Sequence, residues 1–443
     1  MPSVARRLPT PLLAFAFALG VYSFAAGPTL ARQSIAPHYV YLAEAMLHGR
    51  LDLVQPPSSY DLLIVEGRAY VAGSPMPAML LLPFVALFGA GLSDILFSVI
   101  VGALNVALVQ GLFKQWRLTL LFAFGAPQLY LAALGTSWFN AHVVAILFAL
   151  LALRAALGRR RWFLAGLWLA CAGFARPTVL FGAPFFLICI WLTQAQRDRL
   201  RALAAFGAAV ALGVAAHGLY NAARFGSPAD FGYQYTAGAP NITTAYARYG
   251  GFNPRFMPCN LFISILGPPE FNGYVPPLTY TLCAYLVQGV NLSDPSAPIA
   301  PNPLGMSVFV ATPALVLLFA ARRREGWTLA AWIGLLSTLF PLWMYHNTGS
   351  IQFGYRYWMD AAPLWLLLLS LALSARPGSL RSTPAAERRG PTEAQGAQRL
   401  ARSSLPIVEF LIAISIAINI WGFLWMFEKL NGVTWFSVVL GGA

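Results

Sequence analysis

Charged residues are scarce in this chain of 443 residues. Asp, Glu, Lys and Arg make up 10% of it, against the roughly 25% that is typical of soluble proteins. This deficit excludes a water-soluble enzyme, and the 14% aromatic content excludes a disordered chain. With 58% hydrophobic residues, the composition predicts an all-α polytopic membrane protein, because backbone groups in lipid must be paired within helices.

Cysteine is also rare, with four in the chain. Cys171 and Cys189 fall in apolar segments and are interpreted as packing residues. Cys259 and Cys283 share a long loop in what should be an oxidising space, where either a disulfide or two buried thiols fits the sequence. The chain contains no Cys-x-x-Cys pair, which argues against a thiolate zinc site.

Eleven apolar segments approach the length of about 20 residues that a membrane span requires. They are 11–31, 93–113, 118–134, 138–157, 162–175, 177–194, 204–222, 306–321, 327–345, 360–374 and 405–427. Residues 76–90 are apolar too, but this stretch is short and contains Pro83. It is interpreted as an interfacial or re-entrant segment.

The net charge of +14 is interpreted as membrane topology, not as a nucleic-acid signal. With the N-terminus in the cytoplasm and 76–90 not spanning, 20 of the 29 basic residues fall in inside loops, as the positive-inside rule requires. Counting 76–90 as a span would place most of these arginines outside. The sequence therefore predicts about eleven spans, with long outer loops at 32–92 and 223–305.

The predicted organisation has three parts. Residues 1–374 form the transmembrane catalytic region, and its first apolar run is expected to be an uncleaved helix instead of a signal peptide. Residues 375–403 form a disordered basic cytoplasmic linker. Residues 404–443 hold the final transmembrane helix and a short outer tail. Loop 223–305 is poor in charge and is expected to pack onto the membrane helices.

The first outer loop contains a predicted amphipathic helix at 38–48 (HYVYLAEAMLH). His38, Tyr41, Glu44 and His48 share one face at helical spacing, and apolar residues occupy the other face. We expect this helix to lie on the outer membrane surface with its polar face toward a cavity. A plain interfacial helix with a solvated polar face is the alternative.

Arginine marks three further segments, and the last two of them combine it with tyrosine and glycine. Arg176 lies between apolar segments in GFARPTVLFG, where an intramembrane arginine is costly and usually functional, with snorkelling to the interface as the alternative. Arg224 lies in NAARFGSPADFGYQY. The third segment, HNTGSIQFGYRYWMDAAP, contributes His346, Gln352, Tyr355, Arg356, Tyr357 and Asp360. Guanidinium groups suit an anionic head group and aromatic rings suit a sugar; an aromatic belt at the interface is the alternative.

Given these residues, the chain resembles the bacterial GT-C-type glycosyltransferases, an integral-membrane class that includes protein-mannosyltransferase-like and aminoarabinose-transferase-like enzymes. The motifs are YLAEAMLHGRLDL followed by PMPAMLLLPFVALFG, then FARPTVL, and then FGYRYWMDAAPLWLLLL. The resemblance implies a GT-C-like fold in a bacterial inner membrane and an active site on the outer face. It also implies transfer of a sugar from a polyprenyl-phosphate donor to a lipid, glycan or protein acceptor.

The resemblance further implies roles for the candidate residues. The donor phosphate and the rest of the substrate would be bound by Arg176, Arg224, His346, Gln352, Tyr355, Arg356 and Tyr357. The catalytic candidates are His38, Glu44, Asp61 and Asp360. The chain departs from the family at QSIAPH, residues 33–38, where the family usually has an aspartate and this sequence has no carboxylate. We assign no metal ligands, and a divalent metal cofactor stays open.

Other functions compete with this interpretation. An O-antigen ligase or polymerase-like enzyme would share the span number, the large outer loop and the outer Arg and His residues. A lipid-linked glycan flippase or transporter should show midplane charges or matching broken helices in two halves, and the sequence shows no such pairing. An inactive relative is a further alternative because of the missing aspartate. No nucleic-acid partner is expected.

Overall fold

The structure is a computed structural model that describes residues 10–238, 240–287, 297–321, 326–349, 351–373 and 405–439. The predicted linker 375–403 lies outside the described residues. Helices dominate the described chain, and its strands form two small two-stranded sheets. The predicted all-α membrane class is confirmed.

Five described helices are long and apolar enough to cross a membrane. They are α1 (Thr10–Ala26), α4 (Asp94–Phe113), α7 (Ser137–Leu157), α10 (Gln196–Phe225) and α19 (Leu405–Asn431). A sixth span results if α5 (Trp116–Phe124) and α6 (Gln128–Leu134), which are bent by 54°, are counted as one. The predicted count of eleven spans is not confirmed.

Several predicted spans are present as shorter or interrupted helices. These are α8 (Trp162–Gly173), η2 (Pro177–Gly182) with α9 (Ala183–Thr193), α15 (Val308–Ala311) with η6 (Pro313–Ala320), α16 (Trp327–Trp343), and η7 (Arg356–Ala361) with α17 (Ala362–Leu373). Proline explains two of the breaks, because a proline has no N–H to donate and its fixed φ favours the first turn of a new helix. Pro177 opens η2 and Pro313 opens η6. The segment interpreted as interfacial forms the short α3 (Met76–Phe88).

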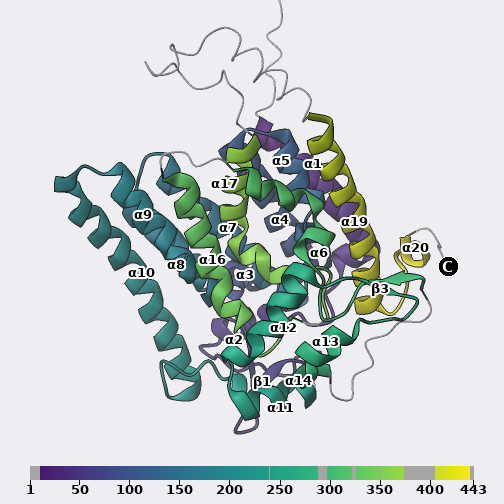
Figure 1. The fold of residues 1–443 in the computed structure, drawn as a ribbon. Coiled ribbons are helices and arrows are strands. Elements are labelled where there is room, and N and C mark those ends of the chain that lie inside the picture. The colour runs from purple at the N-terminus through teal and green to yellow at the C-terminus, as the bar shows by residue number, and fades with distance from the viewer. Residues whose placement is uncertain are drawn as a thin grey trace, which may run out of the picture.

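The loop elements gather at one end of the helical body, the lower end in Figure 1, where α2, β1, α11 and α14 lie. The described loop elements are, in chain order, η1 (Gly27–Ala31), α2 (His38–Leu47), β1 (Leu62–Val65), β2 (Arg68–Val71), η3 (Tyr233–Tyr235), α11 (Pro240–Tyr249), η4 (Pro254–Phe256), α12 (Met257–Leu261), η5 (Phe262–Leu266), β3 (Glu270–Phe271), α13 (Pro277–Leu282), α14 (Ala284–Val287), β4 (Ile299–Ala300) and α20 (Trp435–Val439). Of these, β3 and α20 lie at the right-hand side in Figure 1. Both sheets are antiparallel: β1 and β2 form a hairpin, whereas β3 pairs with β4 after α13 and α14. Glu66 and Gly67 join β1 to β2 with φ of 50° and 76°, as a tight hairpin turn requires.

Helix α2 differs from the sequence expectation. Its buried face holds Tyr39, Val40 and Ala43 and packs against α3, not against lipid. His38, expected on the polar face, is buried, and its Nδ1 lies 3.5 Å from the hydroxyl of Ser137 at the start of α7. The reason for the difference is tertiary: α3 and α7 cover α2 on sides that a surface helix would leave open.

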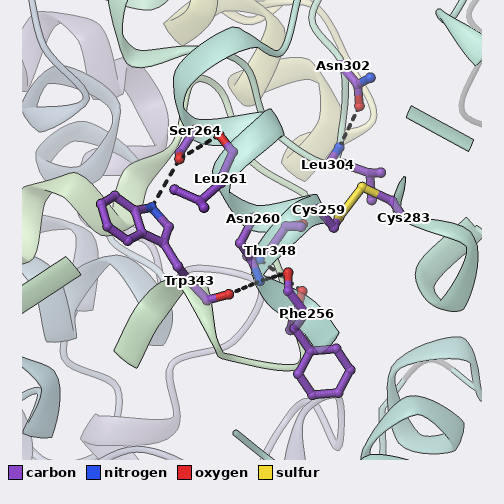
Figure 2. Close-up of a disulfide and its surroundings, with 12 residues drawn as sticks. Phe256, Cys259, Asn260, Leu261, Ser264, Cys283, Asn302, Leu304, Trp343 and Thr348 are labelled. Atoms are coloured by element: carbon purple, nitrogen blue, oxygen red, sulfur yellow. Dashed lines mark hydrogen bonds between the residues drawn. A yellow bond between two sulfur atoms is a disulfide. The ribbon is translucent and has the colours of Figure 1, made fainter. Parts of the chain in front are cut away.

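The second outer loop packs onto the end of α16 (Figure 2). Cys259 and Cys283 form a disulfide. The side-chain amide of the adjacent Asn260 donates to the carbonyl oxygens of Trp343 at 3.2 Å and Tyr345 at 2.8 Å. These two carbonyls belong to the last helical residue and the segment that follows it, where helical partners are missing. The loop therefore contacts the membrane helices directly, next to the disulfide.

The two ends of the described chain meet. The indole N–H of Trp435 on α20 donates to the carbonyl of Ala25 near the end of α1, at 2.8 Å. The ring of Trp435 also packs edge-on against Phe24. These contacts fix the last described helix against the end of the first span.

Candidate active site

Asp360 is the centre of a buried polar cluster. Arg176 donates from Nε to Oδ1 of Asp360 at 2.6 Å, and Thr178 donates from Oγ1 to Oδ2 at 2.6 Å. Nδ1 of His142 lies 2.8 Å from Oδ1, without the alignment of a hydrogen bond. The side chains of Asp360 and His142 are fully buried, whereas that of Arg176 is 17% exposed. The cluster therefore joins α7, the turn before η2, and η7.

Local sequence explains how the arginine enters the cluster. Arg176 precedes Pro177 and is extended, with φ −144° and ψ 106°, because a residue before proline avoids the helical region. Thr178 then lies in the first turn of η2, so the Arg-Pro-Thr sequence places two donors beside one carboxylate. This local arrangement explains why a motif at the end of one short helix reaches a residue 184 positions later.

Two guanidinium groups flank the ring of Tyr357. The Cζ atom of Arg176 lies 5.3 Å from the ring centroid, and that of Arg356 lies 5.6 Å from it. Arg356 is buried, and its Nη1 donates to the carbonyl of Ile351 at 3.3 Å. Its Nε has no partner among the described residues. A buried donor without a partner calls for an explanation, and in a positively charged cluster an anionic ligand supplies one.

Asp61 is the second carboxylate of this region. It lies before β1 with φ 57°, a left-handed conformation that aspartate tolerates better than most residues, and its N–H donates to Ala237. Burial raises the pKa of Asp61, while the Arg356 charge and a hydrogen bond from Trp138 act in the opposite direction. Asp61 is thus the carboxylate from the first outer loop that lies in the field of Arg356.

Aromatic rings connect this region to the second outer loop. Tyr345 packs against Tyr357, with ring centroids 6.1 Å apart, and against Tyr233 at 6.0 Å. His346 packs against Tyr246 on α11 and lies 3.4 Å from the carbonyl of Gly251. Burial lowers the pKa of His346 to about 4, so its ring is neutral near pH 7. His346 therefore adds a polar ring to the aromatic wall and no positive charge.

Gln352 binds the backbone of Arg356, and the neighbouring Tyr355 binds Asn260. The Oε1 of Gln352 accepts from the backbone N–H of Arg356 at 2.9 Å, and its amide nitrogen donates to the carbonyl of Leu304 at 2.9 Å. The Tyr355 hydroxyl donates to Oδ1 of Asn260 at 3.2 Å. Both side chains are fully buried. Direct binding of substrate by these two side chains stays a prediction.

Arg224 has its own partners. Its Nη1 donates to the carbonyl of Val71 at 2.9 Å, its Nη2 donates to Asn221 at 2.9 Å, and its guanidinium stacks 3.9 Å from the ring centroid of Tyr220. These contacts tie the end of α10 to β2. Arg224 and Arg176 share two neighbours, because the positive charge of each acts to lower the pKa of Tyr39 and of Tyr233.

Two of the remaining base candidates, His38 and Glu44, belong to α2. His38 is buried at the start of α2, and burial lowers its pKa to about 4, which makes its ring a weak base. Glu44 is half-buried on α2 and forms no ion pair with a described residue. Asp360 is already held by three side chains. Of the four predicted catalytic residues, Asp61 and Asp360 belong to the region around Arg356.

Sequence reasoning assigned no role to three residues of this region: His142, Thr178 and Trp138. His142 had a usable signal, because a polar residue inside an apolar span is costly and tends to be functional. Thr178 lies within the quoted Arg-Pro motif. Trp138 had no distinctive signal. Among the described residues there is no group of three or more His, Cys, Asp or Glu side chains that could hold a metal ion.

No protein-family model matches this chain, and no curated protein matches its sequence. Among solved structures, the chain is similar to ArnT from Cupriavidus metallidurans bound to undecaprenyl phosphate. The identity is 13% and the TM-score 0.47, over 97% of this chain and 77% of that chain. It is also similar to the archaeal oligosaccharyltransferase AglB from Archaeoglobus fulgidus in complex with an inhibitory peptide and a dolichol-phosphate. Here the identity is 15% and the TM-score 0.43, over 92% of this chain and 56% of that chain. The residue roles rest on the geometry above.

Proposed function

We propose that this chain is a membrane glycosyltransferase that transfers a sugar from a polyprenyl-phosphate-linked donor to an acceptor hydroxyl. The observation that supports the proposal is the pair of guanidinium groups around Tyr357. Arg176 is neutralised by Asp360, whereas Arg356 is buried with an unpartnered Nε. A phosphate would supply both the missing charge and the missing hydrogen-bond acceptor.

Each side chain of this region has a role in the proposed reaction. The acceptor oxygen attacks the anomeric carbon of the sugar while the bond from that carbon to the phosphate oxygen breaks. The leaving lipid phosphate gains negative charge, which Arg356 and Arg176 stabilise. Asp61 takes the proton from the acceptor hydroxyl, and its raised pKa makes it a stronger base than an ordinary aspartate. Tyr357 keeps the two guanidinium groups beside one ring.

Asp360 and Thr178 serve this reaction indirectly. The carboxylate of Asp360 holds Nε of Arg176, which leaves the outer nitrogens of that guanidinium to face the phosphate. Thr178 fixes the second oxygen of Asp360. Asp360 is thus a positioning residue, and Asp61 is the proposed base.

Lipid-phosphate binding tests the phosphate site directly. The probe is undecaprenyl phosphate, titrated into the purified protein in detergent. Arg356→Ala should weaken binding about 10- to 100-fold, because a hydrogen bond to a charged group contributes roughly 1.5–3 kcal/mol. Arg68→Ala, which removes an exposed arginine of β2, is the control and should bind as the wild type does. Equal affinity of the Arg356 and Arg68 variants would refute the phosphate site.

The outer-face location has a separate test. Thr244 on α11 and Arg197 at the start of α10 are exposed, and α10 has 30 residues, about 45 Å of helix, between its two ends. In intact cells an impermeant thiol reagent should label a Thr244→Cys variant and leave an Arg197→Cys variant unlabelled until the membrane is opened. The reverse pattern would place the Arg176 and Arg356 cluster on the cytoplasmic side.

A further inference from the structure

Arginines crowd the two turns that join α7 to α8 and α9 to α10. Residues 154–201 contain seven arginines besides Arg176, and their one acidic residue is Asp198. The seven are Arg154, Arg159, Arg160, Arg161, Arg197, Arg199 and Arg201; Arg199 is half-buried and the others are exposed. In Figure 1, α10 runs from the upper left, where α9 ends, to the end of the body where α2 and β1 lie. This arginine-rich end is therefore the opposite end from the first outer loop.

Two of these arginines, from different turns, are fixed to the same end of α9. Nη1 of Arg160, in the turn between α7 and α8, donates to the carbonyl of Thr193 at 3.0 Å. Nε of Arg199, in the first turn of α10, donates to the carbonyl of Gln194 at 3.2 Å. The Arg199 guanidinium also stacks on Trp191, with Cζ 4.3 Å from the ring centroid. Because Thr193 and Gln194 are consecutive residues, the two guanidinium groups lie close together.

The positive charge of this pair is not neutralised by the described chain. Neither Arg160 nor Arg199 forms an ion pair with a described carboxylate, and Asp198 is paired with Arg197 at 3.5 Å. The carbonyl end of α9 carries only about half a negative charge. Arg199 uses Nε on the backbone, so its Nη1 and Nη2 donate to no described residue. Two fixed guanidinium groups with a surplus of charge suit a phosphate, whose oxygens accept from planar donors.

The level of the arginine pair in the bilayer indicates where the phosphate comes from. Helices α7 and α10 are both apolar and long enough to cross a membrane, and α7 ends at Leu157 while α10 begins at Gln196. Turns at the ends of membrane spans lie at the level of the lipid head groups. The exposed side chains of Trp191 and Leu192 lie in the last turn of α9. Tryptophan is enriched at this level, where its ring contacts both head groups and acyl chains.

We propose that the end of α9 binds an anionic membrane phospholipid, with Arg160 and Arg199 donating to its phosphate and with Trp191 and Leu192 contacting its acyl chains. A phospholipid matches both halves of this surface, the charged half and the apolar half. A soluble phosphate would contact the arginines alone and leave Trp191 and Leu192 uncovered. Basic clusters beside membrane helices recognise anionic lipids by the same physical means.

The lipid site is separate from the proposed transfer site. Arg199 and Arg224 lie on the same helix, 25 residues apart, and Arg224 contacts Val71 of β2. Twenty-five residues of α-helix correspond to about 37 Å along the axis. The arginine pair therefore lies one membrane thickness away from the first outer loop. The proposal does not depend on glycosyl transfer, because the test is a binding measurement.

The test is native mass spectrometry of the purified full-length protein with added phosphatidylglycerol or, as the neutral lipid, phosphatidylcholine. The wild type should prefer phosphatidylglycerol. Arg160→Ala and Arg199→Ala should each weaken the phosphatidylglycerol adduct about fivefold, the effect of one arginine near an anionic lipid surface. Arg199→Lys should restore part of the binding, because lysine keeps the charge and loses the planar donors. Arg197→Ala is the matched control, since Arg197 is an exposed arginine of the same turn that already pairs with Asp198.

The outcomes distinguish a lipid site from general surface charge. A preference for phosphatidylglycerol that Arg160→Ala and Arg199→Ala reduce, and that Arg197→Ala keeps, supports the proposal. Equal losses in Arg197→Ala and Arg199→Ala would reduce the effect to surface charge. Displacement of the lipid by inorganic phosphate would assign the two arginines to a soluble anion. Unchanged binding in both Arg160→Ala and Arg199→Ala would remove the site, and each of these last three results overturns the proposal.

Discussion

Replacing Asp360 with asparagine should destabilise the protein severely, although the two side chains have nearly the same shape. The carboxylate accepts from Arg176 and Thr178 and lies against His142. An asparagine offers one oxygen and one amide group, so at least one donor loses its acceptor in either orientation. Removing one partner of a buried ion pair costs roughly 3–5 kcal/mol. Because Arg176 is 17% exposed, we expect about 3 kcal/mol.

The assay is equilibrium unfolding in mixed detergent micelles, with an exposed ion pair as the control. Arg50 and Asp52 are joined at 2.5 Å, with 48% and 14% of their side chains exposed. The same substitution there, Asp52→Asn, should cost about 1 kcal/mol or less. The ratio of the two losses isolates the effect of burial from the effect of the chemical change.

A double variant tests whether Arg176 and Asp360 act as an ion pair. Arg176→Met combined with Asp360→Asn removes both charges, and the stability should return by about 1.5 kcal/mol or more relative to the sum of the single losses. The double variant should still fail to bind undecaprenyl phosphate tightly, because Arg176 is proposed to contact the phosphate. Purely additive losses would show that Asp360 and Arg176 do not act as an ion pair.

Three further predictions concern titration and cross-linking. Burial raises the pKa of Asp61, so the acid limb of the pH–rate profile of transfer should lie above the ordinary aspartate value of about 4, and Asp61→Asn should be inactive at every pH; an active Asp61→Asn would mean that another group is the base. Burial lowers the pKa of His38 from 6.5 to about 4. Between these values the unfolded chain takes up a proton that the folded chain excludes. The free energy of unfolding should therefore decrease as the pH is lowered from 6.5 to 4, by about 1.4 kcal/mol per pH unit for this one group. Unfolding measured at pH 7, 6 and 5 should show a smaller decrease in His38→Gln. Cys259 and Cys283 are 24 residues apart, so reduction should lower the free energy of unfolding by about 3 kcal/mol, and a melting curve unaffected by reductant would contradict this.

The sequence was sufficient to predict the membrane class and much of the site's composition. Arg176 was identified because an intramembrane arginine is costly. Arg356, Tyr357 and Asp360 were identified because one short segment combines them beside glycine. The sequence did not indicate which of these side chains pair. Arg176 and Asp360 are 184 residues apart, and no local pattern indicates that the Asp360 carboxylate binds Arg176 instead of a substrate or a proton.

The span count and the face of α2 were harder for a different physical reason. Hydropathy reports that a segment avoids water, and a helix buried by its neighbours looks the same as one that faces lipid. The short η6 and α17 are as apolar as α4, yet each is shorter than a bilayer is thick. Likewise, the burial of His38 follows from the approach of α7, which helical periodicity within 38–48 does not contain.

The hydrogen bond from Trp435 to Ala25 bears on how the protein is made. The two residues are 410 positions apart, so the end of the first span acquires this partner only after all the intervening helices have been synthesised. A chain truncated before α19 would keep the described helices α1 to α17 but leave the C-terminal end of α1 without the Trp435 contact.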